Sequence, residues 1–183
     1  MSEATLIESC KNGDRLAFEL LYRRYASSLY TCALRYVSNR HHAEDVLQEA
    51  LIKVFQSIKT FQYEGNFEGW LKRIVIRTAI NDYHKEKKHE AMLNVEGVSY
   101  WSQQDTEILE QLSSEQIMVL IQQLPQGYRL VFNLYEIEGY SHQEIAEALN
   151  ISESTSKSQL FKAKAKLKFE LQKMGVHYYE RVG

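Results

Sequence analysis

The chain has 183 residues with one proline and eight glycines, and so few turn-forming residues argue against a many-stranded protein and favour an all-α fold. Apolar residues make up 44% of the chain and charged residues 25%, as in ordinary globular proteins, which excludes wholesale disorder. The net charge of −2 excludes a uniformly basic nucleic-acid-binding protein, although it leaves room for a local basic face.

The first residues, MSEATLIESCKNGD, show no basic segment followed by an apolar one. We therefore expect no secretory signal, no membrane contact by the protein itself and a cytoplasmic location. In that compartment Cys10 and Cys32 would remain reduced. Neither lies in a close Cys or His pair of the kind that holds zinc, and we expect no metal, no cofactor and no catalytic residue.

Helical periodicity runs through a first block, residues 8–88. Apolar residues recur at helical spacing over 17–25 and, after a break, over 29–36, and a second helix over 41–58 has a wide apolar stripe. Another face of that second helix carries Asp45, Gln48, Glu49 and Ile52 at positions i, i+3, i+4 and i+7. Such a face is most often simply solvated, and the alternative is a docking face for a partner.

The segment FQYEGNFEG then breaks the helical pattern and carries Phe61, Tyr63 and Phe67. Three aromatic residues in a short glycine-containing loop can form a corner of the core, which is the commoner case. They can also form a platform for unstacked bases.

A further helix is predicted over 70–90, with Leu71, Ile74, Val75 and Thr78 facing inward. Its outward stripe consists of polar and basic residues at steps of three or four: Arg73, Arg77, Asn81, His84 and Lys88, flanked by Lys72, Lys85 and Lys87. Arginine and lysine neutralise phosphates, and asparagine can pair with a base edge. The stripe therefore predicts a nucleic-acid-binding surface about as well as it predicts an ordinary solvated face.

From Ala91 to Leu124 the chain has no Lys or Arg but contains Glu96, Asp105, Glu107, Glu110 and Glu115. Its first part has no sustained helical period and includes Tyr100 and Trp101. We interpret residues 91–112 as an acidic linker, for which a plain solvated tether is the simplest alternative.

The second block, 113–173, has clear helix boundaries. Ser113 with Gln116 predicts a capping box, and Pro125 can end that helix or open the next, expected over 127–139 with Leu130, Val131, Leu134 and Ile137 inside. Ser141 with Glu144 predicts a second capping box for a helix over 142–149, with Ile145, Ala146 and Leu149 buried. After a turn at 150–152, Ser152 or Ser154 can cap a last helix that buries Leu160, Ala163 and Leu167.

This order of helix, short turn and helix is typical of a helix-turn-helix DNA-binding unit. Between Leu130 and Ser156 there are five acids and no base, whereas Lys157–Lys173 contains six lysines and one acid. Short polar residues precede the lysines. In a recognition helix, short polar residues near the start contact base edges, and cations further along contact phosphates. The alternative is an ordinary C-terminal helix whose lysines are favoured by the helix dipole. It explains the lysines but not the turn that precedes the helix.

From about Gly13 to Lys173 the chain resembles the extracytoplasmic-function group of the sigma-70 family, the smallest sigma factors of bacterial RNA polymerase. Four segments carry the resemblance in the family's order: GDRLAFELLYRRYASSLY, AEDVLQEALIKVF, FEGWLKRIVIRTAIND and the 45-residue stretch from LPQGY to AKLK. Each segment is moderately specific, and the four in this order are highly specific.

The resemblance implies two small helical domains joined by a flexible acidic linker. These are a region 2 bundle (8–90) and a region 4 helix-turn-helix domain (113–173), with the linker at 91–112 and a tail at 174–183. It implies a sigma factor, not an enzyme, that binds core polymerase and recognises minus-ten and minus-thirty-five elements of promoters. Implied partners are the clamp of the largest polymerase subunit, the upstream flap of the second-largest, promoter DNA and an anti-sigma factor, with nucleoid association in the holoenzyme.

Site residues follow from the resemblance by position. The core-polymerase face comprises Asp45, Gln48, Glu49 and Ile52. The minus-ten contacts comprise Phe61, Tyr63, Asn66, Trp70, Lys72, Arg73, Arg77, Asn81 and His84, with the loop 61–66 as the pocket for a flipped non-template base. The minus-thirty-five contacts comprise Ser154, Thr155, Lys157, Ser158, Gln159 and Lys162. Arg77 stands where many members have Asn, Gln159 where many have Arg, and Ser156 where an aliphatic residue is usual, and these departures bear on base preference.

Two other interpretations remain at this point. A helix-turn-helix regulator with an N-terminal sensor or dimerisation block would bind duplex DNA without polymerase. A helical-bundle metalloenzyme could use Glu86 and His89, which have the i, i+3 spacing of di-iron bundles. That site needs a second, inward-facing pair, and Glu86 and His89 lie in a lysine-rich run; His41, His42, His142 and His177 are expected to be surface or capping residues.

Overall fold

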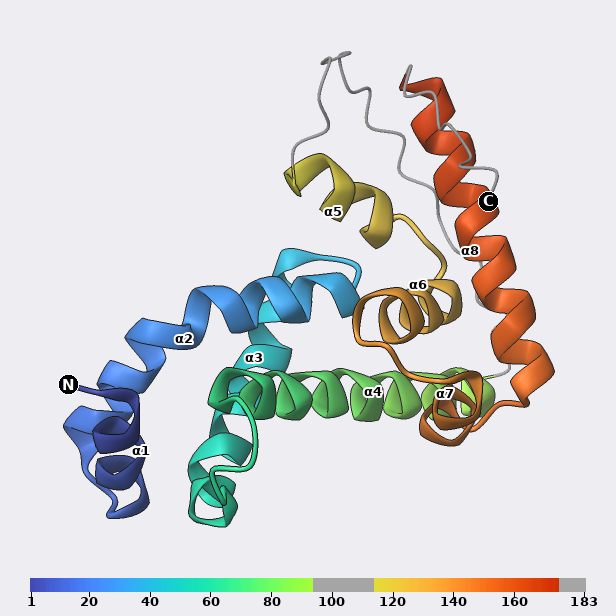
Figure 1. Cartoon of the computed structure of the whole chain (residues 1–183). Helices are drawn as coiled ribbons and strands as arrows, with labels where there is room; N and C mark the ends of the chain where they lie inside the picture. Colours follow the sequence, from blue (N-terminus) through green and yellow to red (C-terminus); the bar gives the residue numbers. More distant parts are fainter. Residues whose placement is uncertain (94–113, 175–183) are drawn as a thin grey trace. The chain divides into compact units, whose positions relative to one another are not determined.

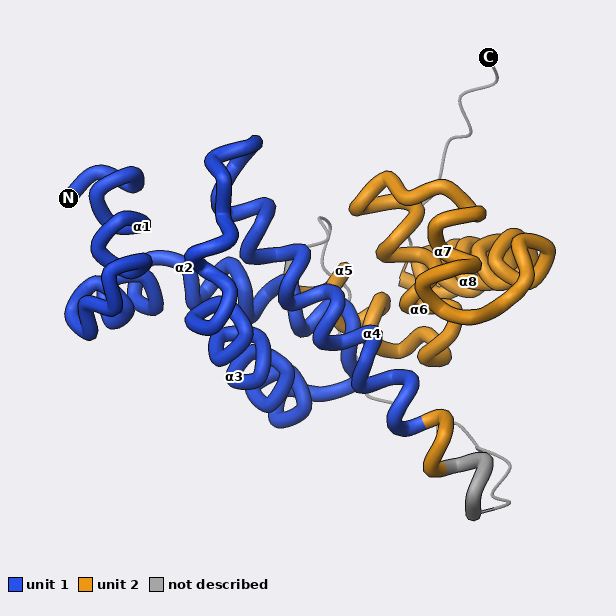
Figure 2. The backbone as a smooth tube through the Cα atoms, turned by 90° about the horizontal axis from the view of Figure 1, so that it is seen from below, with its two compact units in different colours: residues 1–86 blue, residues 87–183 orange. Residues whose placement is uncertain are grey.

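The computed structural model describes residues 1–93 and 114–174; for residues 90–93 and 114 it describes the helical backbone alone. The described residues contain no β-strand, which confirms the all-α fold class. The chain divides into two compact units, residues 1–86 and 87–183 (Figure 2). None of the described helices is both long and apolar enough to cross a bilayer.

Unit 1 contains three complete helices, a 3-10 turn and most of a fourth helix (Figure 1). These are α1 (Glu3–Lys11), α2 (Arg15–Tyr36), α3 (Arg40–Ser57), the turn η1 (Ile58–Thr60) and α4 (Phe67–Leu93). Helix α2 packs against α1 and α3, and α1 also packs against η1. The core between them includes Leu21, Leu29, Val54 and Leu71, all inaccessible to solvent. Burying one such side chain stabilises the fold by roughly 1.5–3 kcal/mol.

Helix α1 is absent from the sequence prediction, which begins the first block at residue 8. The helix begins at Glu3, and the Ser2 hydroxyl accepts a hydrogen bond from the Thr5 N–H at 3.2 Å. It buries Leu6, Ile7 and Cys10. Burial raises the pKa of the Cys10 thiol to about 11, so this free cysteine stays protonated. The N-terminal residues are therefore part of the core of unit 1.

Short polar side chains set the starts of the long helices, as the physics of unpaired N–H groups requires. Asp14 accepts from Leu16 N–H at the start of α2, and Asn39 accepts from His42 N–H at the start of α3. At the start of α4, Asn66 Oδ1 accepts from the N–H of Glu68 at 2.7 Å. The caps of α2 and α3 each lie where the chain turns between two helices that pack together.

Unit 2 contains four further helices and a π-helical turn: α5 (Ser114–Gln122), α6 (Gln126–Phe132), the turn η2 (Asn133–Ile137), α7 (His142–Leu149) and α8 (Glu153–Lys173). Helix α8 packs against α5, α6 and α7. Pro125 opens α6, and the predicted capping box of Ser141 and Glu144 is confirmed. Asn150 adopts a left-handed backbone with φ 52° and ends α7, and Ser152 caps α8. The helix-turn-helix arrangement is therefore present.

The predicted helix over 127–139 is wrong in its second half. The backbone widens to a π-helical turn at η2, where the Glu138 N–H donates to the Asn133 carbonyl five residues earlier. This change of period rotates Ile137 outward, so it is 40% exposed rather than buried as predicted. The chain leaves the turn at Gly139, whose φ of 76° matches its predicted role as a helix end.

A few smaller expectations also need correction. The break expected between residues 25 and 29 is absent, because α2 is continuous over Arg15–Tyr36. Ile74, Ala146 and Leu167 are half-buried rather than fully inside. The predicted linker lies largely outside the described residues, including Tyr100 and Trp101, as do Ser113 of the first predicted capping box and His177 in the tail.

Candidate functional site

The predicted docking face of α3 forms one side of that helix. Asp45, Gln48 and Ile52 are exposed, with Ile52 at 55%, while Glu49 is half-buried. The opposite side of α3 is buried, so the helix presents this face from a rigid support. An exposed isoleucine among polar side chains suits a protein–protein contact. That the face binds polymerase stays a prediction.

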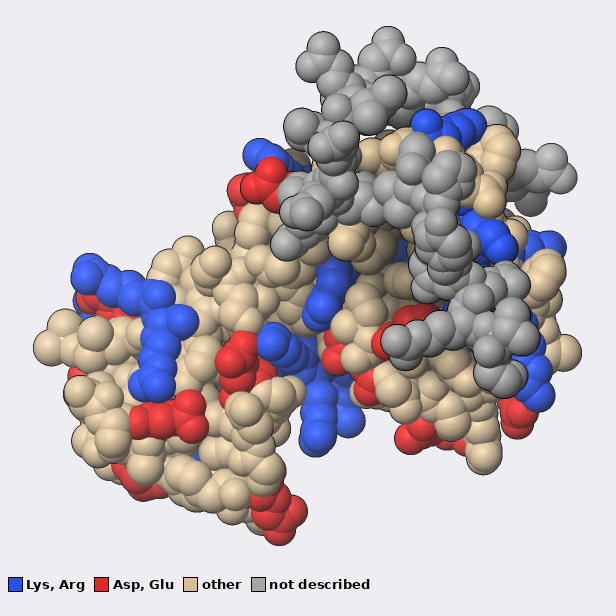
Figure 3. All heavy atoms as spheres, turned by 45° about the horizontal axis from the view of Figure 1, so that its top comes forward, with Lys and Arg blue, Asp and Glu red and all other residues tan. Residues whose placement is uncertain are grey.

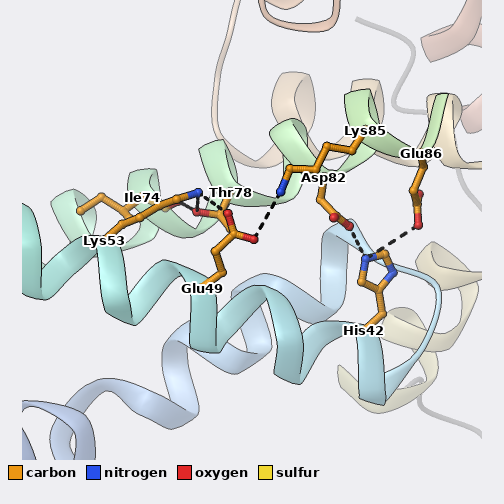
Figure 4. A network of polar contacts seen from close by, with 8 residues as sticks. All are labelled: His42, Glu49, Lys53, Ile74, Thr78, Asp82, Lys85 and Glu86. Atoms are coloured by element: carbon orange, nitrogen blue, oxygen red, sulfur yellow. Dashed lines mark hydrogen bonds and ion pairs between the residues drawn. The ribbon is translucent and has the colours of Figure 1, made fainter. Parts of the chain in front are cut away.

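Glu49 links the predicted docking face to α4 (Figure 4). Its carboxylate lies 2.8 Å from Lys53 Nζ on the same helix and 3.6 Å from Lys85 Nζ on α4. The hydrogen bond from Lys53 holds the pKa of the Glu49 carboxyl below its usual range. Lys53 also donates to Thr78 Oγ1 at 3.2 Å, and that hydroxyl donates to the Ile74 carbonyl at 2.8 Å. The two predicted surfaces thus share an ion-pair network that sequence spacing did not reveal.

His42 joins the same two helices at another point. Its Nε2 forms a hydrogen bond with Asp82 and lies 3.9 Å from Glu86 Oε1 (Figure 4). The expectation of a merely surface or capping role for His42 is wrong, because the ring is half-buried between α3 and α4. Donor atoms of the three residues lie within 4.8 Å of one another, so this set could ligate a cation. The direct bond between His42 and Asp82 already accounts for the arrangement.

The loop between η1 and α4 is built on an aromatic cluster. Phe61 and Phe67 are buried and meet with ring centroids 5.0 Å apart. Trp70 is half-buried and lies 5.4 Å from Phe61 and 5.7 Å from Phe67. Tyr63 is 46% exposed, and Asn66 is exposed while its Oδ1 caps α4. Phe61 and Phe67 thus form a corner of the core, whereas Tyr63 and Trp70 offer accessible ring surface. That this loop binds unstacked bases stays a prediction.

The outward stripe of α4 carries unpaired cations. Arg73 and Arg77 are exposed, and neither pairs with a carboxylate within residues 1–93 or 114–174. Asn81 is exposed in line with them, and His84 is half-buried one turn further. Lys72, in contrast, is half-buried and forms an ion pair with Glu68 at 2.8 Å. Two guanidinium groups and an amide on one helix face can contact phosphates and base edges.

Hydroxyl groups at the start of α8 are arranged by the helix cap. Ser152 Oγ accepts from the Thr155 N–H at 3.0 Å and lies 2.8 Å from both Ser154 Oγ and Thr155 Oγ1. Ser158 donates to the Thr155 carbonyl at 3.0 Å. Ser154 and Ser158 remain exposed. The predicted minus-thirty-five residues therefore share the first turns of one helix.

The lysine and glutamine side chains of α8 differ in how far they are exposed and in whether they form ion pairs. Lys162 is exposed and pairs with no carboxylate in the described part of the chain, whereas Lys157 lies 3.9 Å from Glu153. Lys164 is exposed and forms an ion pair with Glu136 at 2.7 Å. Gln159 is half-buried. Figure 3 shows blue side chains along the right-hand side, with an acidic group below them.

Sequence reasoning missed a buried polar contact beneath the recognition helix. Ser156 is fully buried, and its hydroxyl lies 2.9 Å from His142 Nδ1 at the start of α7. The His142 ring stacks on Tyr135 with centroids 4.5 Å apart. His142 therefore ties α7 to α8 rather than merely lying on the surface as expected. The one signal in the sequence was Ser156 itself, a polar residue where an aliphatic residue is usual.

Arg129 was also missed. It is only 3% exposed, and its Nη1 donates to the Gln122 carbonyl at 2.7 Å. A cation there satisfies a carbonyl at the C-terminal, negative end of α5. This contact joins the end of α5 to α6 inside unit 2.

Comparisons with known proteins match both units. The family model described as "Sigma-70 region 2" matches residues 21–89, and that described as "Sigma-70, region 4" matches residues 114–167. The first match contains the α3 face, the aromatic loop and the α4 stripe. The second contains the helix-turn-helix.

Whole-length relatives agree. The chain is 32% identical over 183 residues to the ECF RNA polymerase sigma-E factor of Haemophilus influenzae, covering 94% of this chain and 96% of that protein. It is 30% identical over 179 residues to the RNA polymerase sigma-H factor of Pseudomonas aeruginosa, covering 91% and 92%. The sigma factor RpoE from Bartonella quintana, solved with the anti-sigma factor NepR, shares the fold with a TM-score of 0.53 at 20% identity, covering 85% of this chain and 96% of that one.

Proposed function

Because the chain belongs to the extracytoplasmic-function group of the sigma-70 family, we infer that it is a sigma factor, which directs promoter-specific initiation of transcription with RNA polymerase. The observation that carries this conclusion is the presence of regions 2 and 4, in that order, in one chain that matches its relatives over nearly their whole length. The protein acts by binding and positioning, and we propose no covalent chemistry for it.

We propose residues 8–90 as region 2, 91–112 as linker, 113–173 as region 4 and 174–183 as tail. Within region 2, the exposed face of Asp45, Gln48, Glu49 and Ile52 would dock on the clamp of the largest polymerase subunit. The carboxylates and an exposed aliphatic side chain on a rigid helix support this role. Region 4 would approach the upstream flap of the second-largest subunit.

For the minus-ten element we propose the loop 61–66 and the exposed stripe of α4. Extruding a base from a duplex costs a few kcal/mol, which stacking and hydrogen bonds in a pocket can offset. The accessible rings of Tyr63 and Trp70 supply stacking surface, and Arg73, Arg77 and Asn81 are available for phosphates and base edges. The remaining predicted contacts on this surface are Phe61, Asn66, Lys72 and His84.

For the minus-thirty-five element we propose the start of α8 in the major groove, with Ser154, Thr155, Lys157, Ser158, Gln159 and Lys162 as contacts. The exposed hydroxyls precede the lysines, which matches the order of base and phosphate contacts along a recognition helix. The acidic residues of α7 and η2 oppose DNA binding by the free protein. Polymerase would overcome that opposition by aligning both DNA-contacting helices.

An anti-sigma factor is proposed as a competing partner. It would cover the same α3 face that we propose to dock on polymerase, because that face combines the exposed carboxylate of Asp45 with the exposed side chain of Ile52. Covering it would hold the protein inactive without altering its DNA-contacting helices.

In vitro transcription with core polymerase over a library of genomic promoters tests the function. We expect start sites that depend on the added chain and share two sequence elements. A gel-shift with and without core polymerase tests whether the free chain binds promoter DNA. We expect binding only when core polymerase is present. Tight duplex binding by the free chain would instead support an autonomous helix-turn-helix regulator.

A further inference from the structure

Tyr63 has an unusual backbone for a residue with a large side chain. Its φ is 61°, in the left-handed region where Cβ crowds the backbone and glycine is favoured. The other non-glycine residue with positive φ among those described, Asn150, ends a helix, where asparagine is common. Because no helix end accounts for the backbone of Tyr63, contacts from elsewhere must hold it.

Two residues of α1, far away in sequence, supply those contacts. The Tyr63 O–H donates to Glu8 Oε1 at 2.6 Å. Lys11 Nζ lies 4.4 Å from the centroid of the Tyr63 ring, within the range of a cation–π contact. Lys11 and Glu8 also pair with each other at 3.2 Å. Together the three side chains form a closed set of contacts, which we call the α1 latch.

The latch stands on a rigid base. Helix α1 buries Leu6, Ile7 and Cys10 against the rest of unit 1 and packs on η1, which leads directly into the loop. Phe61, at the start of the loop, lies 5.3 Å from the Tyr63 ring and is itself buried. Tyr63 is thus held at its hydroxyl by α1 and at its ring by Lys11 and Phe61.

On the basis of the proposed function, we propose that Glu8 and Lys11 are positioning residues for base capture: they preset Tyr63, and with it the loop 61–66, for the flipped non-template base. Lys11 occupies one face of the Tyr63 ring, so a base stacks on the ring surface that remains exposed. A side chain held in its bound geometry before binding loses less freedom when the ligand arrives.

The electrostatics of the latch agree with this role. The hydrogen bond to Glu8 raises the pKa of Tyr63 to about 12, so the phenol stays a neutral donor. The same bond, together with the one from Lys11, lowers the pKa of the Glu8 carboxyl, which stays ionised. The latch therefore remains closed throughout the neutral pH range.

The test uses holoenzyme reconstituted from core polymerase and the full chain. Transcription is measured on promoters that differ only in the non-template base at each minus-ten position, and the readout is the preference ratio between bases. Variants are Glu8→Ala, which breaks the latch, Glu8→Gln, which keeps an acceptor oxygen, and Tyr63→Phe, which removes the donor. Glu19→Ala is the matched control, because it removes a surface carboxylate on α2 that pairs with Arg23.

We expect Glu8→Ala and Tyr63→Phe each to lower the preference ratio at one position by about tenfold, the effect of losing one charge-assisted hydrogen bond. The double variant should be no worse than either single one. Glu8→Gln should lower the ratio less than Glu8→Ala, because its amide oxygen still accepts from Tyr63 but carries no charge, and Glu19→Ala should keep the ratio near that of the wild type.

An unchanged ratio in Glu8→Ala, or a uniform loss of transcription on all templates, would overturn the inference, because the second result marks a merely structural role. Failure of the wild-type holoenzyme to initiate at any promoter would instead overturn the proposed function. The two failures are therefore distinguishable.

Discussion

The side-chain amide of Gln159 lies directly against Gly127 of α6. A methyl group added to Gly127 would come within 3.2 Å of both the Nε2 and the Oε1 atom of Gln159. The Oε1 atom is buried and accepts no hydrogen bond from the residues that the structure describes. Because a buried acceptor without a donor costs about 1–3 kcal/mol, the amide would gain free energy by turning outward to a hydrogen-bond donor, such as the one we propose on DNA.

Gly127→Ala should displace the Gln159 amide from its resting place without unfolding region 4. Alanine also favours the helix by roughly 0.5–1 kcal/mol, so thermal stability should change little. Holoenzyme with this variant should bind duplexes carrying the minus-thirty-five element more tightly. In a Gln159→Ala background the same change should have no effect, giving a coupling of at least about 0.5 kcal/mol. Equal effects in both backgrounds would refute the role of this contact.

Asp45→Lys combined with Gln48→Ala should abolish association with core polymerase. Both side chains are exposed, so the fold should be intact by circular dichroism and thermal unfolding. Glu19→Lys is the control, since Glu19 is exposed on α2 and lies outside the predicted face. Co-purification with core measures the outcome, and wild-type recovery of the double variant would show that polymerase docks elsewhere.

Arg73→Ala and Arg77→Ala should weaken promoter opening in different ways. If Arg73 binds a phosphate, its removal should reduce the salt dependence of binding by about one unit of slope for every sequence. If Arg77 binds a base edge, its removal should relax preference at one position, by about 1–3 kcal/mol. Arg15→Ala, another exposed arginine of unit 1, should change neither. Salt titrations of holoenzyme on matched promoters measure both effects.

Asp82→Ala should destabilise region 2 by about 1–3 kcal/mol, because it leaves the half-buried His42 without its main partner between α3 and α4. Glu86→Ala should cost less, since Glu86 is exposed and lies 3.9 Å from the ring. Urea unfolding of the full chain, followed by a probe in region 2, compares the two. A larger loss of stability for Glu86→Ala would contradict this ranking.

Acidification should open the α1 latch. The Tyr63 O–H and Lys11 lower the pKa of Glu8 in the folded protein below its ordinary value of 4.5. A depressed carboxyl pKa contributes stability that is fully present above the unfolded value and disappears as pH falls through the folded value. The side-chain carboxyl ¹³C resonance of Glu8 should report this titration, and Tyr63→Phe should move its midpoint up toward 4.5. Identical midpoints would show that Tyr63 does not hold Glu8.

Features set by neighbouring residues were predictable from sequence. The capping box of Ser141 and Glu144, the role of Ser152 and the end at Gly139 depend on spacings of a few residues, and all three are present. The shared face of Asp45, Gln48 and Ile52 follows from the helical period alone. Local chemistry is visible in a sequence because its partners stand close together in it.

Features that join distant segments were not predictable in this way. Glu8 and Tyr63 are 55 residues apart, and His42 and Asp82 are 40 apart, so no periodicity relates them. The π-helical turn at η2 places the neighbouring residues Asn133 and Leu134 in the core together, which the ordinary helical period of the sequence did not predict. Packing between elements decides such features.

Helix α4 also fixes the spacing of the predicted minus-ten contacts that it carries. It runs without interruption from Arg73 to His84, and at 1.5 Å per residue this stretch spans about 17 Å, the length of roughly five stacked base steps. Inserting one residue after Ile80 would turn all that follows by about 100°, carrying Asn81 and His84 off the line of Arg73 while every side chain remained present. Substitutions can therefore alter the outward stripe of α4 one residue at a time, whereas an insertion or deletion would disrupt the alignment of the whole stripe.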